Sequence, residues 1–404
     1  MPSRTLLSLA PSAFVPALVY EIGNGAIAPI IVLTASALGA SPGTAAFMLA
    51  LLGVGRVLGD VPAALLADWL GDRKSMMVAA CLSLAASFVC MIAPSLAILG
   101  GALTVIGMSN ATFYLARQSY LIEVVPRRLR ARAMSSLAGA HRIGLLIGPF
   151  IGAGVISLTD VSKAYLVAMA AAAVTALLLF VIPDVEAPSG QRSSIRGGAS
   201  SLQMFIAHRR MFATLGLAIL AIGAVRAARQ AVLPLWGEHL GLSPAVISLI
   251  FGIASITDIA LFYPSGKVMD QYGRLAVALP STLILGVAMM TLPLTQGVVS
   301  LTIVASLMSL GNGIGSGIMM TLGADVSPFD NRVRFLGAWR LVSDSGNAAG
   351  PVVMSLVATA WTLAAGIVVI GSAGLFAAAA LAIWLPKYSL FATPRSTRVN
   401  RSLP

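Results

Sequence analysis

Ten ionisable side chains lie inside long apolar stretches of the sequence, where an uncompensated charge is costly. Residues of this kind are candidates for function by default. Their types suit two kinds of chemistry: reversible protonation of a carboxyl group, and ion pairing or anion binding by guanidinium groups. The ten are Glu21, Arg56, Asp60, Arg117, Arg142, Arg226, Arg229, Asp258, Arg340 and Asp344.

Glu21 stands in the segment Tyr20-Glu21-Ile22-Gly23-Asn24 and has no cation beside it in sequence. A low-dielectric surrounding favours the neutral form of a carboxyl group, which suits reversible protonation. We therefore predict that Glu21 carries a proton or contacts a cationic substrate. The alternatives are a structural, hydrogen-bonded acid or a partner of Arg226. His141 and His208 are interpreted as incidental.

Enzymatic chemistry is not indicated. The sequence contains no nucleophile–base constellation, no cluster of metal ligands and no phosphate-binding loop. Cys81 and Cys90 lie in one apolar stretch without a nearby histidine, and they are interpreted as small buried residues rather than as a disulfide. We therefore expect no catalytic residues, no metal and no cofactor.

The composition places the candidate residues in a membrane. Hydrophobic residues make up 58% of the chain and charged residues 10%, whereas soluble domains carry about 25% charged residues. A core of this size could not hide so much apolar surface, so lipid must surround much of it. The net charge of +12 does not indicate nucleic-acid binding, because no basic helix or aromatic platform accompanies it.

Apolar stretches of spanning length, about 20 residues, recur along the whole chain. The first is too long for a signal peptide. The sequence thus predicts an all-α membrane protein with twelve spans, at 11–36, 43–66, 75–94, 97–121, 133–157, 162–183, 211–236, 243–266, 275–294, 297–321, 334–357 and 361–384.

The distribution of positive charge predicts the orientation. Of the 26 lysines and arginines, 19 lie in the tails or in loops on the same side as the tails, and only Lys163 lies in a loop on the other side. The positive-inside rule therefore places both termini in the cytoplasm, and the composition suggests a bacterial inner membrane. The predicted domains are a first half at 1–183, a cytoplasmic linker at 184–210, a second half at 211–385 and a cytoplasmic tail at 386–404.

The two halves repeat each other at one constant offset of 202 residues. The matching residues come from the end of span 2 and the loop after it, from span 4 and from span 5. Pro62, Asp68, Gly71, Asn110, Gly144, Gly148 and Pro149 fall on Pro264, Asp270, Gly273, Asn312, Gly346, Gly350 and Pro351. A parallel repeat of six spans predicts a pseudo-two-fold axis along the membrane normal and a site between the halves.

Three motifs resemble those of the major facilitator superfamily, and the resemblance covers the whole chain. The loop after span 2 reads Asp68-Trp-Leu-Gly71-Asp72-Arg73-Lys74, and its mate reads Asp270-Gln-Tyr-Gly273-Arg274. Span 5 carries Gly144-x-x-x-Gly148-Pro149-x-x-Gly152, which is similar to the motif of proton-coupled exporters. Asp72 departs from the family pattern, because that position is usually basic, and the family's arginine motif early in span 4 is missing.

The resemblance implies alternating access between two halves, with spans 1, 4, 7 and 10 lining the cavity. Residues on those spans are assigned to the proton and substrate site: Glu21, Asn24, Arg117, Arg226, Arg229 and Asn312. The three arginines favour an anionic or zwitterionic substrate over a large cation. Some of them could instead pair with Glu21 or extend toward the membrane surface.

The loop motifs predict a latch at the cytoplasmic end of each half. Aspartate can accept bonds from amides at a helix N-terminus, and glycine permits a tight turn. Arg73 or Lys74 can pair with Glu123, and Arg274 with Asp325. We interpret the two sets as latches of the outward-facing state, the alternative being a solvated cluster of loop charges. The residues are Asp68, Gly71, Arg73, Lys74 and Glu123 in the first half, and Asp270, Gly273, Arg274 and Asp325 in the second.

The glycines of span 5 predict a close helix contact. Gly144, Gly148 and Gly152 recur every four residues and form a smooth ridge on one helix face. Pro149 removes one backbone hydrogen bond and is expected to bend the helix. The alternative is ordinary packing of small residues, since glycine is common in membrane helices.

The remaining buried charges predict ion pairs between the halves. The implied fold packs span 2 on span 11 and span 5 on span 8. It would bring Arg56 to Asp344 and Arg142 to Asp258, and a third pair would join Asp60 to Arg340. The alternative is pairing within each half, for example between Arg56 and Asp60 at i, i+4.

The sequence thus favours a monomeric, proton-coupled exporter of small organic molecules, with protons, substrate and lipid as its partners. An uptake symporter or a uniporter is the alternative within the same class, and a membrane-embedded enzyme or sensor is the remote one.

Overall fold

The computed structural model describes residues 14–125, 130–182, 205–315, 317–328, 332–394 and 396, and these residues form helices without strands. The chain divides into two compact units. The first comprises Met1–Ser41, Met48–Ile195 and Ser243–Gly252, and the second comprises Pro42–Phe47, Arg196–Leu242 and Ile253–Pro404.

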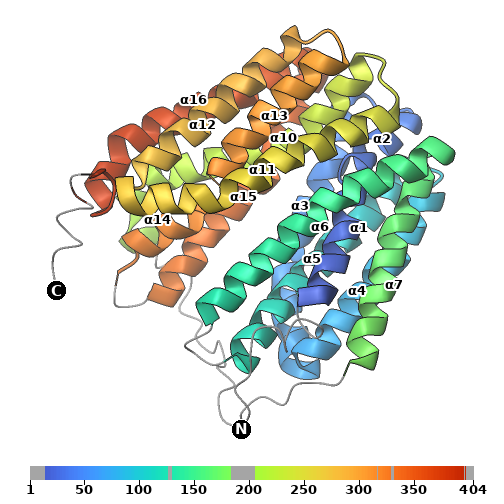
Figure 1. Ribbon diagram of the computed structural model, residues 1–404, viewed down its shortest axis with the longest axis horizontal. Coiled ribbons are helices and arrows are strands. Elements are labelled where there is room, and N and C mark those ends of the chain that lie inside the picture. The colour runs from blue at the N-terminus through green and yellow to red at the C-terminus, as the bar shows by residue number, and fades with distance from the viewer. Residues whose placement is uncertain are drawn as a thin grey trace. The chain divides into compact units, whose positions relative to one another are not determined.

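The first half of the chain contributes six of the predicted spans. Its elements are α1 (Val15–Ile27), α2 (Ile30–Ala37), α3 (Pro42–Leu70), α4 (Asp72–Ile92), α5 (Leu96–Val124), α6 (Arg130–Leu158), the short 3-10 helix η4 (Val161–Ala164) and α7 (Tyr165–Val181). Helix α1 packs against α6 and α7, and α4 packs against α5 and α7 (Figure 1).

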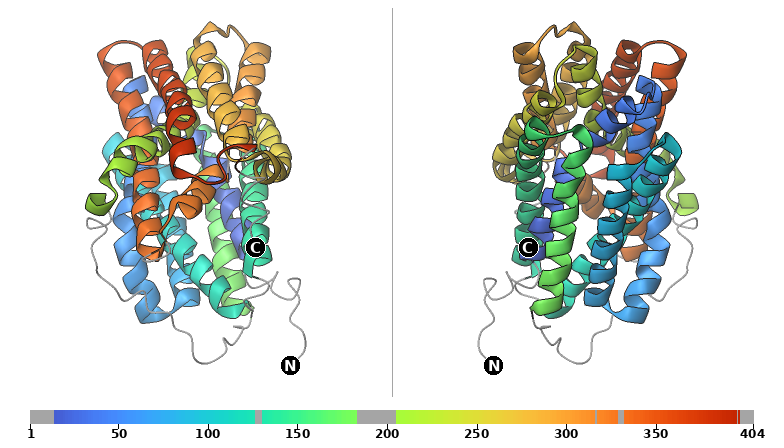
Figure 2. Two further views of the ribbon diagram at one scale, coloured as in Figure 1. Left: turned by 90° about the vertical axis from the view of Figure 1, so that its left-hand side faces the viewer. Right: turned by 90° about the vertical axis from the view of Figure 1, so that its right-hand side faces the viewer.

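The second half repeats this packing. Its elements are α9 (Arg209–Met211), the π-helical turn η5 (Phe212–Gly216), α10 (Leu217–His239), α11 (Pro244–Tyr272), α12 (Leu275–Thr291), η6 (Leu292–Leu294), α13 (Val298–Ile314), α14 (Ile318–Val326), α15 (Arg332–Ala360) and α16 (Leu363–Tyr388). Helix α10 packs against α15 and α16, and α12 packs against α13 and α16 (Figure 2).

The helix bounds follow the predicted 202-residue offset. Helices α3 and α11 match at both ends, as do α6 and α15, and each of the four has 29 residues. Four glycines in the described part of the chain have positive φ, and they form two mated pairs: Gly39 with Gly241, and Gly71 with Gly273. A left-handed backbone disfavours any residue with a Cβ atom, so both halves turn at the same positions for the same reason.

Eleven helices among the described residues are long and apolar enough to cross a membrane. The remaining predicted span, 334–357, is occupied by α15, which is long but carries polar residues that include Arg340, Asp344 and Asn347. Large apolar side chains such as Leu158 and Phe180 are exposed, as expected of surfaces that face lipid. Cys90 is buried as predicted, whereas Cys81 is exposed on α4.

Two predicted spans are interrupted. The first divides into α1 and α2 around Ala28 and Pro29, because proline has no N–H with which to continue the helix. The tenth divides into α13 and α14 around Gly315 and Gly317, at residues of low helix propensity. The mates of these two spans, α10 and α5, are continuous. The repeat therefore conserves where helices begin and end, but not where they are interrupted.

Candidate functional site

Glu21 is fully buried in the first half, and four side chains surround its carboxylate. Arg117 Nη1 lies 3.3 Å from Oε1 and His141 Nδ1 lies 2.8 Å from the same oxygen. On the other oxygen, Oε2, the Tyr114 hydroxyl donates a hydrogen bond of 3.1 Å and the Asn24 amide one of 3.3 Å. The carboxylate thus has donors on both oxygens, as a buried charge requires.

The glycine ridge of α6 explains how three helices reach one carboxyl group. A Cβ atom added at Gly144 would lie 2.5 Å from the Cβ of Glu21, and one added at Gly148 would lie 2.5 Å from the amide nitrogen of Ala26. Only glycine permits this approach of α6 to α1. His141 lies one turn before Gly144 on the same face of α6, so the close packing delivers its imidazole to Glu21. Pro149 lies inside α6, which continues to Leu158.

Tyr114 connects the carboxylate to a second arginine. Arg56 Nη2 donates a 3.3 Å hydrogen bond to the Tyr114 hydroxyl. The guanidinium carbons of Arg56 and Arg117 lie 5.0 Å and 4.9 Å from the centre of the Tyr114 ring, within cation–π range. The ring therefore contacts two cations while its hydroxyl donates to Glu21. In the described geometry, Arg56 is bound within its own half.

The interpretation of His141 as incidental is wrong, because its Nδ1 is among the atoms closest to the Glu21 carboxylate. Nδ1 makes no aligned hydrogen bond among the described residues, so the two atoms are in close contact without hydrogen-bond geometry. One signal in the sequence could have indicated it: His141 precedes Gly144 by three residues and shares the face of the glycine ridge. His208, by contrast, lies edge-on to Phe335 and contributes to aromatic packing.

The second half holds a different polar cluster. Asn312 on α13 donates a 2.9 Å hydrogen bond to Asp258 on α11. On α10, Arg229 donates a 2.6 Å bond to the hydroxyl of Ser309, and Arg226 donates a 3.4 Å bond to the carbonyl of Asn312. Positions 226, 229, 258 and 312, predicted from the sequence as site or ion-pair residues, thus lie in one cluster of their own half.

The position of Glu21 has no charged equivalent in the second half. Its mate at the 202-residue offset is Gly223, and the mate of His141 is Ser343. A Cβ atom added at Gly223 would lie 2.8 Å from the carbonyl oxygen of Ser343, so α10 approaches α15 as closely as α1 approaches α6. The helix contact is repeated, but the carboxyl–imidazole pair belongs to the first half alone.

Three predicted latch residues of the second half lie together. Arg274 Nε lies 2.7 Å from one carboxylate oxygen of Asp325, and its Nη2 donates to the other at 3.3 Å. Its Nη1 lies 3.4 Å from Asp270. Because Arg274 and Asp325 are largely buried and the contact is bidentate, this pair is of the stronger kind.

The segment after α16 joins this cluster. The backbone amides of Arg274 and Leu275 donate to the carbonyls of Phe391 and Ala392, each at 2.9 Å. These are orphan amides at the beginning of α12, which would otherwise lack partners. A Cβ atom added at Gly273 would lie 2.8 Å from the backbone of Thr393, so glycine also makes room for the segment. The predicted tail begins later than expected, since α16 runs to Tyr388.

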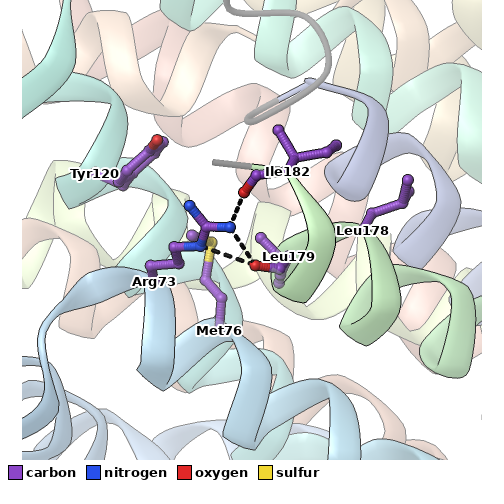
Figure 3. A pocket seen from close by; sticks show the side chains of 6 residues that line it. All are labelled: Arg73, Met76, Tyr120, Leu178, Leu179 and Ile182. Atoms are coloured by element: carbon purple, nitrogen blue, oxygen red, sulfur yellow. Dashed lines mark hydrogen bonds between the residues drawn. The ribbon is translucent and has the colours of Figure 1, made fainter. Parts of the chain in front are cut away.

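In the first half, the described contacts of the latch arginine are different ones. Arg73 donates to the carbonyls of Leu179 and Ile182 at the end of α7, as Figure 3 shows. The mate of Arg274 is Asp72, and Arg73 stands one residue later. One residue turns a side chain by about 100° around a helix, which directs Arg73 toward α7. The side chain of Glu123 lies outside the described residues, so its predicted pairing with Arg73 or Lys74 stays a prediction.

One predicted ion-pair residue has a partner in its own helix. Arg340 Nε lies 3.4 Å from Asp344 Oδ2, four residues along α15. This is the kind of pairing within one half that the sequence left open as the alternative. The pairs predicted between the halves, Arg56–Asp344, Arg142–Asp258 and Asp60–Arg340, join residues of different halves and stay predictions.

Comparison with known proteins decides the family. The model of the Major Facilitator Superfamily matches residues 13–228 and again residues 215–402. The chain belongs to this superfamily. The two matches correspond to the two repeated halves. No curated protein shows significant sequence similarity to the chain.

Solved structures of other facilitators share the fold at low sequence identity. A bacterial homologue of the human lysosomal transporter Spinster is 14% identical, with a TM-score of 0.72 over 100% of both chains. A D-xylose–proton symporter is 15% identical, with a TM-score of 0.73 over 98% of this chain and 99% of that one. A POT family transporter in complex with 5-aminolevulinic acid is 12% identical, with a TM-score of 0.76 over 95% and 96%. Because the chain belongs to the Major Facilitator Superfamily, the protein is a facilitator-type transporter and not an enzyme.

For this facilitator, we predict that Arg274 and Asp325 depend on each other. Arg274→Asp or Asp325→Arg alone leaves two like charges in a largely buried site, at a cost of about 3–5 kcal/mol. The double exchange restores an ion pair and is expected to recover most of the lost thermal stability in detergent. The exposed residue Asp270 supplies the control, because Asp270→Asn should have a small effect. If the double exchange is no more stable than either single change, the pair does not stabilise the fold.

The predicted pairing of Arg56 with Asp344 has its own test. We expect Arg56→Asp and Asp344→Arg each to reduce transport about tenfold or more, and the double exchange to recover it, since reversing both charges preserves the attraction. Transport into proteoliposomes is the measurement. If the double exchange transports no better than either single change, the two residues do not pair during the cycle.

Proposed function

We propose that this facilitator exports a small organic molecule in exchange for protons, with Glu21 as the proton carrier. The observation that supports this is a single carboxyl group, with 0% exposed surface, held by Arg117 and His141 and by two neutral donors. A buried carboxylate among cations can exchange its charge for a proton, and that exchange changes every contact around it.

Export of substrate in exchange for protons is expected if the substrate and the proton compete for Glu21. A positively charged or hydrogen-bond-donating group of the substrate would bind the carboxylate in the deprotonated state. A proton arriving at Glu21 removes the negative charge and releases that group. An anionic group on the same substrate would bind arginine, because both polar clusters hold more arginines than acids: Arg56 and Arg117 beside Glu21, and Arg226 and Arg229 near Asp258. A zwitterionic substrate fits this set best.

Uptake with protons is the second candidate, and the contact between Arg117 and Glu21 favours it specifically. At 3.3 Å, the carboxylate holds the guanidinium group. A proton on Glu21 would free Arg117 to bind an anionic substrate, so proton and substrate would bind together. One of the solved structures with this fold is that of a D-xylose–proton symporter.

We further propose that the protein is a monomer in a bacterial inner membrane with both termini in the cytoplasm. The support for the orientation is the distribution of basic residues, of which 19 lie on the side of the termini and Lys163 alone on the other. In this orientation the Arg274–Asp325 pair lies at the cytoplasmic end of the second half and acts as a latch of the outward-facing state.

Flux into proteoliposomes under an imposed pH gradient tests both candidates. The panel contains organic cations, organic anions, zwitterions and sugars. Accumulation into vesicles with an acidic lumen indicates exchange for protons, and accumulation from an acidic exterior indicates symport. We expect a zwitterion to accumulate in vesicles with an acidic lumen. A substrate flux that is the same with an acidic lumen and with an acidic exterior would contradict proton coupling.

A further inference from the structure

We propose that His141 relays protons between water and Glu21. The inference rests on the proposed function, because it assigns a route to the proton that Glu21 carries. The observation behind it is a difference in access: 34% of the His141 side chain is exposed, whereas the side chain of Glu21 has no exposed surface. In this conformation, a proton from water therefore needs an intermediate group to reach the carboxyl group.

The orientation of the imidazole suits such a relay. Nδ1 is buried and lies 2.8 Å from Oε1 of Glu21. The exposed surface of the side chain thus belongs to its other atoms, which include the second nitrogen, Nε2. An imidazole can accept a proton at one nitrogen while it donates from the other. The torsion χ2 of histidine is soft, so a small rotation aligns Nδ1 with the carboxylate.

The transfer step is balanced in protons. A proton from water binds Nε2 of a neutral imidazole that carries its hydrogen on Nδ1, which gives the imidazolium ion. The Nδ1–H bond then breaks and an O–H bond forms at Oε1 of Glu21. The products are a neutral carboxyl group and a neutral imidazole protonated at Nε2. One proton has entered the site, and the reverse sequence returns it to water.

The other groups near Glu21 are poorer relays. Helix α5 contributes Arg117 and Tyr114. Neither guanidinium groups nor phenols exchange protons readily near neutral pH. Helix α3 contributes Arg56, which contacts Tyr114 rather than the carboxylate. The remaining neighbours of α6, η4 and α7, supply Lys163 and Tyr165, and η4 follows the opposite end of α6 from His141. Among the described side chains that touch Glu21, His141 is more exposed than Arg117, at 34% against 11%, and an imidazole gains and loses a proton readily near neutral pH.

The helix contact fixes the relay distance. His141 and Gly144 lie on the same face of α6, and Gly144 is packed against Glu21 itself. The second half has the same helix contact, but Gly223 stands in the place of Glu21 and Ser343 in the place of His141. Neither residue can relay a proton as a carboxyl group and an imidazole can. The relay is therefore a feature added to one half of a repeated scaffold.

A pH-jump experiment on the full-length protein in lipid nanodiscs tests the relay without any substrate. Infrared difference spectroscopy follows the C=O stretching band of a protonated carboxyl group, and the band that is absent from Glu21→Gln is assigned to Glu21. We expect this band to form in the wild type after a jump to acidic pH. In His141→Gln it should form at least about tenfold more slowly, because a general acid–base group has been removed.

Two further variants control for structural effects. His208→Gln changes a histidine that packs on Phe335, and it should keep the wild-type rate. His141→Asn keeps a polar atom near the Nδ1 position but lacks the second nitrogen, so it should be slow even where its melting temperature equals that of the wild type. An unchanged rate in both His141 variants overturns the relay and leaves Glu21 as the carrier. If no band is lost in Glu21→Gln, Glu21 does not take up the proton, and the proposed function fails together with the relay.

Discussion

Glu21→Gln is expected to abolish pH-driven accumulation of substrate in proteoliposomes, with a loss of about a hundredfold or more. Glutamine has nearly the shape of glutamate and can still accept a hydrogen bond, but it cannot gain or lose a proton at physiological pH. The variant should continue to exchange labelled for unlabelled substrate across vesicles without a gradient, because that exchange needs alternating access but no net proton movement. The same substrate, identified in the flux panel, serves for both measurements.

Glu238→Gln is the matched control, since Glu238 is an exposed glutamate near the end of α10. It should keep both activities. Full pH-driven accumulation by Glu21→Gln would show that another group carries the proton. Loss of both activities, with an unchanged melting temperature, would mean that substrate binding requires the negative charge of Glu21 and not only a hydrogen-bond acceptor at this position.

Gly148→Leu is expected to have the largest effect on folding. A Cβ atom at this position would lie 2.5 Å from both the amide nitrogen of Ala26 and the carbonyl oxygen of Ile22. These are backbone atoms of α1, which cannot rotate away as a side chain could. Overpacking of this kind typically costs about 1–3 kcal/mol, occasionally more, and a leucine adds further atoms to the clash. We expect a markedly lower melting temperature in detergent and a low yield of folded protein.

The same helix supplies a matched control at Gly154, where an added Cβ atom meets nothing within 4 Å. Gly154→Leu should melt close to the wild type. The repeat supplies a second comparison, because Gly350 on α15 packs as tightly against Ala224 on α10. Gly350→Leu should therefore be as damaging as Gly148→Leu. Equal stability of the Gly148 and Gly154 variants would contradict the packing argument.

Much of the fold can be predicted from the sequence because few backbone structures are stable in lipid. Each span must satisfy its own backbone hydrogen bonds, so apolar length predicts a helix directly. The positions at which helices are interrupted cannot be predicted in this way. Pro264, Pro280 and Pro351 lie inside continuous helices, whereas Pro29 coincides with a break. A proline alone therefore does not predict a break, because the missing N–H is tolerated within three of these helices.

Those residues of the candidate site that carry a charge within an apolar segment could be predicted from the sequence. Glu21 and Arg117 stand out in the sequence as charges within apolar segments, and the structure brings them together. His141 was missed because it lies beside Arg142 and has no neighbour in sequence that explains it. Its role depends on how closely α6 packs against α1. Arg73 shows the same limit, since a shift of one residue relative to Arg274 changes the helix it contacts.

The contact between the segment after α16 and the beginning of α12 affects how the protein should be handled in the laboratory. Two backbone amides of α12 depend on the carbonyls of Phe391 and Ala392. A purification tag or fluorescent protein fused directly after Tyr388 would replace those carbonyls with a foreign chain and would crowd Gly273. Fusion partners therefore belong beyond Ser396 or at the other terminus, and a low yield from a shorter chain would reflect the lost cap rather than an unstable transporter.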